Sequence, residues 1–205
     1  MLKVYGRTSS VNVQKVMWMV GELGLEHERM DVGGAFGQND QDWYLALNPM
    51  GRVPVLDDDG YVLWESHSIL RYLAKKHGGA LYPGEPRAGA DVDKWMDWQL
   101  GFLQPAITPA FWGLIRTPEA DRDLAAIQAA SAQTAKLYAI VDGHLRGRDF
   151  LAGDGFSIAD MPVGAMTYRW YGLDVEHPDY PNLRAWYERL SERPAFREHV
   201  MLPIT

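Results

Sequence analysis

The chain has 205 residues, of which 47% are hydrophobic, a net charge of −7 and no cysteine. Its length suffices for one large core or two small ones, and its acidic balance excludes a nucleic-acid-binding surface. The lack of cysteine excludes disulfides, a cysteine nucleophile and thiolate metal sites. No apolar run approaches membrane-spanning length, and the first residues have no signal-peptide pattern. We therefore expect a cytoplasmic protein without a membrane or nucleic-acid partner.

The first fifty residues predict a strand, a helix and a second strand. Residues 2–5 alternate as a strand does, and apolar residues then recur at helical spacing over residues 13–23. Gly24 ends that helix. A second strand is expected at 27–31, followed by a loop with one short helix at 40–47.

Two more strands and a helix complete this part of the chain. We expect strands at 53–56 and 61–64, joined by the hairpin turn DDDG, and then a helix over 66–77. The order is a parallel βαβ unit followed by a ββα unit, which gives one four-stranded sheet. The sequence thus predicts an α/β domain over residues 1–79.

The rest of the chain predicts a linker and an all-helical domain. Residues 80–90 hold two prolines and two glycines, as a linker does, and no convincing strand follows over 91–205. The first helix of this domain should be bent or broken by Pro105 and Pro109, because each proline removes a backbone donor. The four predicted helices are 91–116, 118–146, 157–171 and 181–193.

A capping box, Ser157-Ile-Ala-Asp160, opens the third of these helices. The serine hydroxyl is expected to accept from the backbone N–H three residues on, while the aspartate reaches back. Phe156 and Met161 stand at the positions of a hydrophobic staple. We interpret this motif as a folding device worth roughly 1 kcal/mol, not as a catalytic pair.

The dipeptide Val53-Pro54 is a candidate ligand-binding element. Pro54 opens a predicted strand, where its missing N–H needs an explanation. A cis bond would turn the N–H and C=O of Val53 outward, where an extended peptide-like ligand pairs with both. The alternative is an ordinary trans proline at the start of an edge strand, and the context favours cis.

Glu65 and Ser66 stand where the fourth strand meets its helix. A helix N-terminus presents free N–H groups and a positive dipole end to a carboxylate, and the Ser66 hydroxyl adds a donor. Glu65 is placed to accept from a ligand ammonium group. The pair therefore suits the zwitterionic end of an amino acid, although an N-cap role for the serine is the alternative.

Taken together, these motifs resemble the glutathione transferase superfamily, and the resemblance spans the whole chain. It rests on the segments NPMGRVPVL, ESHSILRYL, FSIAD and PNLRAWYERLSERPAF. It implies an α/β thioredoxin-like N-terminal domain that binds glutathione as co-substrate, and an all-α C-terminal domain that binds a small apolar electrophile. It also implies a homodimer. The six histidines show no metal-ligand spacing, so we expect no metal.

Carried onto this sequence, the resemblance assigns glutathione contacts to seven residues of the first domain. Val53 would pair through its backbone with the cysteinyl part, and Glu65 and Ser66 would hold the γ-glutamyl end. Arg52 and the polar pair before the short helix would contact the glycyl carboxylate. The seven residues are Gln38, Asn39, Arg52, Val53, Pro54, Glu65 and Ser66.

The chemistry implied by the resemblance falls to the first strand–helix turn, RTSSVNVQKV. Conjugation needs a thiolate, because the thiol is a poor nucleophile. Lowering a thiol pKa by about two units takes roughly 2.7 kcal/mol. A hydrogen bond to a charged group supplies about 1.5–3 kcal/mol, and a helix N-terminus about 0.3–1 kcal/mol. A hydroxyl at this turn therefore suffices without a general base.

Ser10 occupies the position of the catalytic serine in theta- and delta-like members of the superfamily. Those members usually continue Ser-x-Pro-Cys/Ser-Arg, whereas the order Ser-x-Asn here is similar to the Nu class. Asn12 is therefore expected to be a second donor to the sulfur. Ser9 and Tyr5 are the alternative thiolate donors. A helix cap is the alternative role for both serines, and packing is the alternative role for the tyrosine.

The electrophile side of the site is assigned to the helix that contains the two prolines. We expect Phe111, Trp112 and Ile115 to line an apolar cleft, although an aromatic stripe at helical spacing more often belongs to a core. His67 is expected at the surface or at a subunit contact.

The sequence therefore predicts a glutathione transferase that activates the glutathione thiolate for attack on an apolar electrophile. Two other hypotheses stay open. One is a glutathione-dependent disulfide or peroxide reductase, which the Ser-x-Asn order favours. The other is a non-catalytic ligand-binding protein with the same fold.

Overall fold

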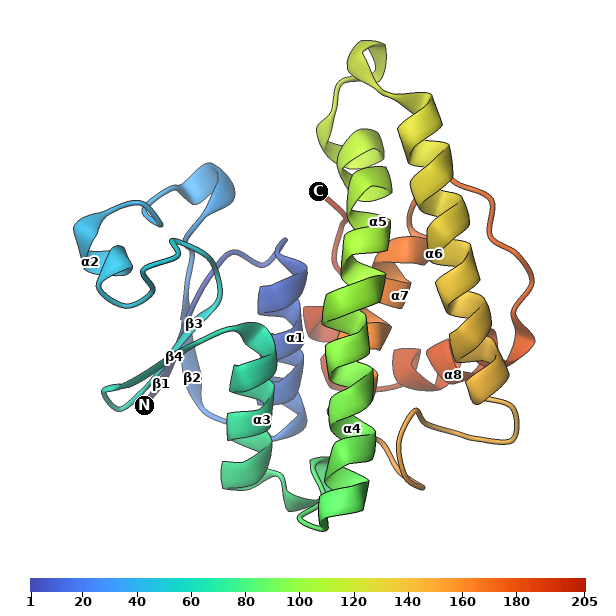
Figure 1. Ribbon diagram of the computed structural model, residues 1–205. Helices are drawn as coiled ribbons and strands as arrows, with labels where there is room; N and C mark the ends of the chain where they lie inside the picture. The colour runs from blue at the N-terminus through green and yellow to red at the C-terminus, as the bar shows by residue number, and fades with distance from the viewer. The chain divides into compact units, whose positions relative to one another are not determined.

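A computed structural model describes the whole chain, residues 1–205 (Figure 1). The chain forms two compact units, the first made of Met1–Tyr82 and Pro194–Leu202, the second of Pro83–Arg193 and Pro203–Thr205. The strands are β1 (Leu2–Tyr5), β2 (His27–Met30), β3 (Val55–Asp58) and β4 (Tyr61–Trp64). The helices are α1 (Val11–Glu22), α2 (Asp42–Leu45), α3 (Ser66–His77), α4 (Pro86–Trp98), α5 (Gln104–Phe111), α6 (Leu124–His144), α7 (Asp160–Tyr171), α8 (Pro181–Ser191) and α9 (Pro194–His199). None of the helices combines the length and the apolar character needed to cross a bilayer.

A four-stranded sheet with the order β2-β1-β3-β4 forms the centre of the first unit. β1 runs parallel to β2 and antiparallel to β3, which pairs antiparallel with β4. In the hairpin, Asp59 has φ 51 and Gly60 has φ 92, so both central residues of the turn are left-handed, as a tight two-residue hairpin requires. The predicted βαβ unit followed by a ββα unit is confirmed.

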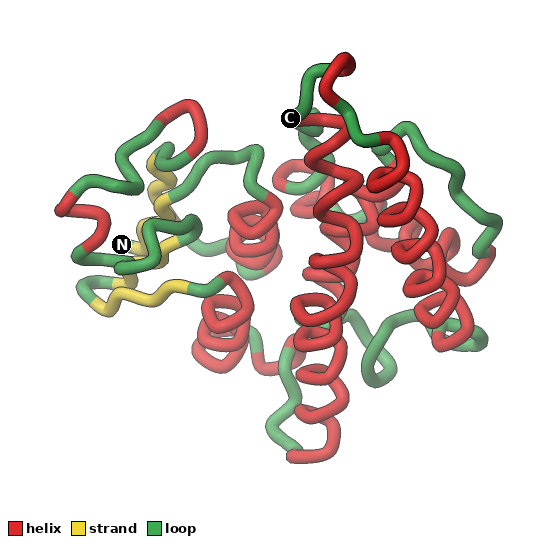
Figure 2. The backbone as a smooth tube through the Cα atoms, turned by 45° about the horizontal axis from the view of Figure 1, so that its top comes forward, coloured by secondary structure: helices red, strands yellow, loops and turns green.

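Both faces of this sheet are covered (Figures 1 and 2). α1 and α3 lie side by side over one face, where alternation along the strands places the buried side chains of Val4 and Leu56. On the other face, the segment that contains α2 packs Tyr44 and Val32 against Val55. The sheet is therefore packed between two apolar layers.

The last helix, α9, packs on the first unit. Phe196 is fully buried, with its ring 4.6 Å from that of Trp18 on α1. A Cβ atom at Gly21 would lie 2.9 Å from both Ala195 and His199, so the absence of a side chain there permits the close approach of the two helices. The boundary therefore differs from the predicted one, which placed all of residues 91–205 in the helical domain.

The connection between the units is shorter than the predicted linker over residues 80–90. Gly79–Leu81 forms a 3-10 turn, and α4 already begins at Pro86. Glu85 caps that helix by accepting from the Ala88 N–H at 2.8 Å. A proline in the first helical turn needs no backbone donor, so this proline starts a helix instead of keeping the segment irregular.

The helical run that begins at α4 continues to Arg116, so of the two predicted effects of the prolines, a bend or a break, the break does not occur. Two π-helical turns, Gln99–Leu103 and Trp112–Arg116, flank α5. Pro105 lies in the first turn of α5, directly after the first π-helical turn. A π turn shifts the hydrogen-bond register by one residue, which lets the helix accommodate the donor that Pro105 lacks, while Pro109 lies inside α5.

The predicted capping box at the start of α7 is present in altered form. Asp160 reaches back and accepts from the Ser157 N–H at 3.0 Å, but the Ser157 hydroxyl accepts from the Ala159 N–H at 3.3 Å, one residue earlier than expected. Asp160 also accepts from the Leu151 N–H and from Trp186 Nε1, both at 2.9 Å. Burial raises the pKa of Asp160 to about 6, against the opposing effect of these hydrogen bonds.

Candidate active site

Three of the segments singled out in the sequence meet at one end of the sheet. Tyr5, the last residue of β1, pairs with Val55, the first residue of β3. Val55 also pairs with Trp64, the last residue of β4. The turn after β1, the residues before β3 and the residues after β4 therefore extend side by side from one row of paired residues.

The first of these segments packs closely on the second. A Cβ atom at Gly6 would lie 2.4 Å from Val13 Cγ2 and 3.2 Å from Val53 Cβ, so only glycine fits between the two valines. The Val53–Pro54 peptide bond is cis, the isomer that the sequence context favours. Pro54 is buried and Val53 is half-buried, so the valine lies at the accessible rim of the sheet.

Ser10 is the N-cap residue of α1, but its hydroxyl does not cap the helix. Its backbone is extended, with φ −84 and ψ 120, and its side chain makes no cap hydrogen bond. The Ser10 carbonyl instead accepts from the Gln14 N–H at 2.9 Å, and the Gln14 side chain donates to the Thr8 carbonyl at 3.0 Å. The half-buried hydroxyl is therefore left for another partner.

The other two candidate thiolate donors differ from each other. The ring of Tyr5 packs 6.0 Å from that of Trp43 and 6.5 Å from that of Tyr44, in agreement with a packing role for the tyrosine. Ser9 is half-buried on the same turn as Ser10, so it stays the alternative donor.

Asn12 lies two residues after Ser10 and faces a buried lysine that sequence reasoning missed. Its Oδ1 accepts from Lys15 Nζ at 3.1 Å, and the same Nζ is 3.3 Å from His67 Nε2. Lys15 is fully buried and His67 is 4% exposed. The expectation that His67 lies at the surface or at a subunit contact is therefore wrong. A polar residue beside an apolar helical face gives no sequence signal for such a pairing, and lysine is almost never fully buried.

Glu65 and Ser66 mark the start of α3. Glu65, not Ser66, is the N-cap residue, and it has φ 70 and ψ 113 without a side-chain cap bond. Residues other than glycine rarely adopt a positive φ. The Glu65 side chain is exposed, whereas Ser66 is 6% exposed. The alternative of an N-cap role for Ser66 therefore does not describe this turn.

Arg52 is exposed on a loop whose backbone is firmly held. Its carbonyl accepts from Tyr44 Oη at 2.7 Å and from Asn48 Nδ2 at 2.8 Å. Burial raises the pKa of Tyr44, so its hydroxyl stays a donor. Asn39 Nδ2 donates to the carbonyl of Gly51 at 2.9 Å, so the Asn39 side chain supports this loop. Gln38 is exposed.

The three residues assigned to the electrophile lie at the end of α5 and on the π-helical turn after it. Phe111 is buried, and the guanidinium of Arg169 lies 4.0 Å from the centre of its ring. Trp112 is 57% exposed and Ile115 is half-buried. Phe111 is thus packed within the helical unit, whereas Trp112 and Ile115 offer accessible apolar surface.

Comparisons with known proteins agree with this geometry. Residues 1–75 match the domain family "Glutathione S-transferase, N-terminal domain", and residues 103–194 match "Glutathione S-transferase, C-terminal domain". Glutathione S-transferase GstB of Escherichia coli is 38% identical over 208 residues, which cover 100% of both chains. Glutathione S-transferase 3 of Zea mays is 32% identical over 97% of this chain and 93% of its own.

A solved structure gives the same result. The theta class glutathione S-transferase from Xanthomonas axonopodis pv. citri with glutathione bound has a TM-score of 0.97 and 44% sequence identity, and the match covers 100% of this chain and 99% of that chain. Both domain families and the full-length relatives point the same way, and they confirm the architecture and the superfamily that the sequence motifs indicated: the chain belongs to the glutathione S-transferase family.

Proposed function

We propose that this protein joins the sulfur of glutathione to a small apolar electrophile, with Ser10 as the donor that stabilises the thiolate. The observation that carries this proposal is the Ser10 hydroxyl, which stands at the N-terminus of α1 and is not used to cap that helix. The relatives from Escherichia coli and Zea mays are named glutathione S-transferases, and the Xanthomonas relative holds glutathione.

In the proposed pose, glutathione binds along the three segments that extend from the end of the sheet. Glutathione lies extended along Val53, with its γ-glutamyl end at Glu65 and Ser66 and its glycyl carboxylate near Arg52. The thiol then reaches the turn that carries Ser10. Its proton leaves to solvent, the hydroxyl donates to the remaining thiolate, and the dipole of α1 favours the negative charge. The sulfur lone pair forms a carbon–sulfur bond with the electrophile. In a substitution the leaving group departs with its bonding pair, and in an addition the π bond breaks and its pair moves to the neighbouring atom, which takes a proton from solvent.

Replacing Ser10 tests the proposal. Ser10→Ala should raise the pKa of the bound thiol and lower kcat/KM with a halogenated nitroaromatic by about 10- to 100-fold, because one hydrogen bond to a charged group is lost. Glutathione binding, measured by calorimetry, should be nearly unchanged. Ultraviolet titration of the bound thiolate gives the pKa. Ser9→Ala is the matched control on the same turn, and an effect in Ser9→Ala alone would transfer the role to that serine.

The choice of reaction needs a separate measurement. Ser10 followed by Asn12 also suits a glutathione-dependent reductase, so turnover with a hydroperoxide, a disulfide and a halogenated aromatic should be compared under one set of conditions. Binding without turnover on all three would favour a ligand-binding protein. A homodimer is proposed by analogy with the family alone, and sedimentation velocity measures the mass that decides it.

A further inference from the structure

Lys15, on the second turn of α1, is a fully buried lysine, with 0% of its surface exposed. Burying an ammonium group costs several kcal/mol unless its neighbours compensate, and lysine is rarely found in this state. Its Nζ lies 3.1 Å from Asn12 Oδ1 and 3.3 Å from His67 Nε2. Packing alone would favour an apolar side chain of similar volume at this position, so the charge needs another reason.

The contact with Asn12 fixes the direction of an amide. An ammonium group has three donors and no acceptor, so only the carbonyl oxygen of the asparagine can face it. The NH2 group of Asn12, with its two donors, is therefore turned away from Lys15. Asn12 is the second residue of α1, next to the turn on which the Ser10 hydroxyl is uncommitted. The lysine thus decides which end of the amide is available to a ligand at that turn.

The contact with His67 holds the Lys15 ammonium group in place. A ring nitrogen that faces an ammonium group must be the acceptor, so Nε2 is unprotonated and the neutral ring carries its proton on Nδ1. His67 is the second residue of α3 and follows Ser66 directly. Lys15 therefore joins the turn proposed to activate the sulfur to the helix start proposed to hold the γ-glutamyl end.

We propose that Lys15 is a positioning residue for the thiolate, acting through Asn12. It holds the asparagine amide with its N–H donors toward the glutathione sulfur. Lys15 itself does not touch glutathione. The inference rests on the proposed function, because it assigns the geometry of one donor in that same site.

The first experiment keeps the lysine and changes the amide. In Asn12→Asp, the carboxylate still accepts from Lys15 but has no N–H to donate. We expect a melting temperature equal to or above that of the wild type, because the buried pair becomes ionic. We also expect the pKa of the bound thiol to rise by about one unit or more and kcat/KM at pH 6.5 to fall about tenfold or more. An unchanged thiol pKa in this variant overturns the proposal.

The second experiment changes the lysine. Lys15→Met removes the donors and the charge at similar volume and should raise the thiol pKa by about one unit. Lys15→Arg keeps donors and charge, and its thiol pKa should stay close to the wild-type value. The matched control is Lys136→Met on α6, the same change at an exposed position, which should have no effect. In the Asn12→Ala background, Lys15→Met should add little, because the two residues act as one unit.

The outcomes separate this inference from the proposed function. A wild-type thiol pKa in Lys15→Met, or full additivity with Asn12→Ala, overturns the positioning role and leaves the transferase proposal standing. A Ser10→Ala variant without any effect on the bound thiol contradicts the proposed function itself. If Lys15→Met does not fold, the Asn12→Asp result decides, since that variant keeps the buried lysine paired.

Discussion

Glu65 combines an exposed acidic side chain with a backbone conformation that few residues other than glycine adopt, with φ 70 and ψ 113. Such a conformation costs of order 1–3 kcal/mol and persists only where the surroundings enforce it. Here it stands at the start of α3, at the end of the sheet where the candidate segments meet. The strain and the proposed contact with the ligand ammonium group thus involve the same residue.

Replacing Glu65 by glycine should therefore stabilise the protein and weaken the binding of glutathione. Glu65→Gly should raise the free energy of unfolding by about 1 kcal/mol, because glycine tolerates the positive φ, less the entropy that glycine gains in the unfolded chain. Calorimetry should show weaker glutathione binding. Asp59→Gly, also at a positive φ but in the β3–β4 hairpin, should leave binding unchanged. A destabilised Glu65→Gly variant would contradict this account.

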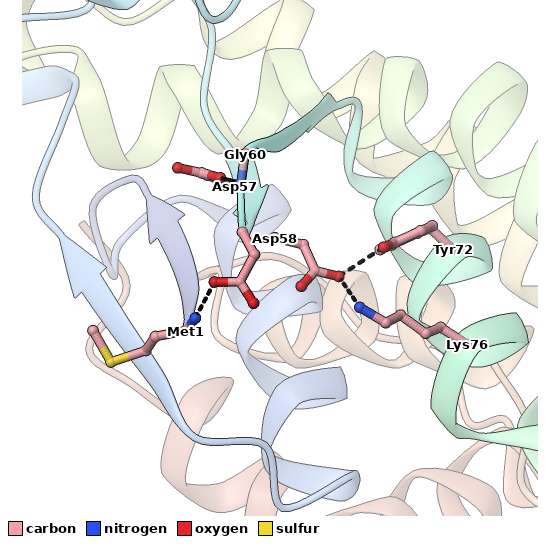
Figure 3. A network of polar contacts seen from close by, with 7 residues as sticks. Met1, Asp57, Asp58, Gly60, Tyr72 and Lys76 are labelled. Carbon is pink, nitrogen blue, oxygen red and sulfur yellow. Dashed lines mark hydrogen bonds and ion pairs between the residues drawn. The ribbon is translucent and has the colours of Figure 1, made fainter.

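Contacts between elements fix where the site residues stand. Asp58, the last residue of β3, accepts from Tyr72 and Lys76, both on α3 (Figure 3). The hydrogen bond from Lys76, followed by that from Tyr72, holds the pKa of Asp58 below its usual value. This contact ties the end of the hairpin to the helix that begins with the proposed γ-glutamyl site.

The packing of α9 on α1 gives a test at the same scale. In Gly21→Ala, the new Cβ would lie 2.9 Å from Ala195 and from the His199 ring, so α9 must shift, at a cost of about 1–3 kcal/mol. Denaturant unfolding followed by tryptophan fluorescence measures this cost. Gly143→Ala on α6 is the matched control, since its Cβ would meet nothing within 4 Å, and it should gain about 0.5–1 kcal/mol. Equal stability of the two variants would show that the helices are not in close contact.

The sequence was sufficient for the elements whose signals are local. Helical spacing and Gly24 delimited α1, and the DDDG turn predicted the hairpin of β3 and β4. The contact of Gly21 with α9 joins residues far apart in the chain, and no local pattern encodes it. The site divides in the same way: the turn of Ser10 and the Glu65-Ser66 step were visible as motifs, but the buried pairing of Lys15 with His67 was not.

In the molecule as a whole, the pKa values of Asp58 in the first unit and Asp160 in the second unit are shifted in opposite directions. Asp58 in the first unit has a lowered pKa, so its contribution to stability is present above about pH 3.8 and is lost as the pH falls further. Asp160 in the second unit has a pKa raised to about 6. Its contribution is complete below about pH 3.8 and is lost as the pH rises through 6.

The two units should therefore respond differently to mild acid. Between pH 7 and pH 4.5, protonation of Asp160 stabilises the second unit, while Asp58 stays ionised and the first unit gains nothing from it. Hydrogen exchange resolved by segment, corrected for the intrinsic pH dependence of exchange, should show protection rising around α7 and α8 but not around α3. Asp58→Asn should leave this difference intact. Equal changes in both units would contradict the assignment.

The packing of α9 on α1 also has a consequence for the folding of the protein during translation. Trp18 emerges early from the ribosome, but Phe196, which covers it, is synthesised almost 180 residues later. At about 5–20 residues per second, this interval lasts roughly ten seconds or more. During translation the nascent first unit exposes an apolar surface on α1 until the chain has been synthesised as far as residue 202. The first unit therefore begins to be translated first but is completed only near the end of synthesis.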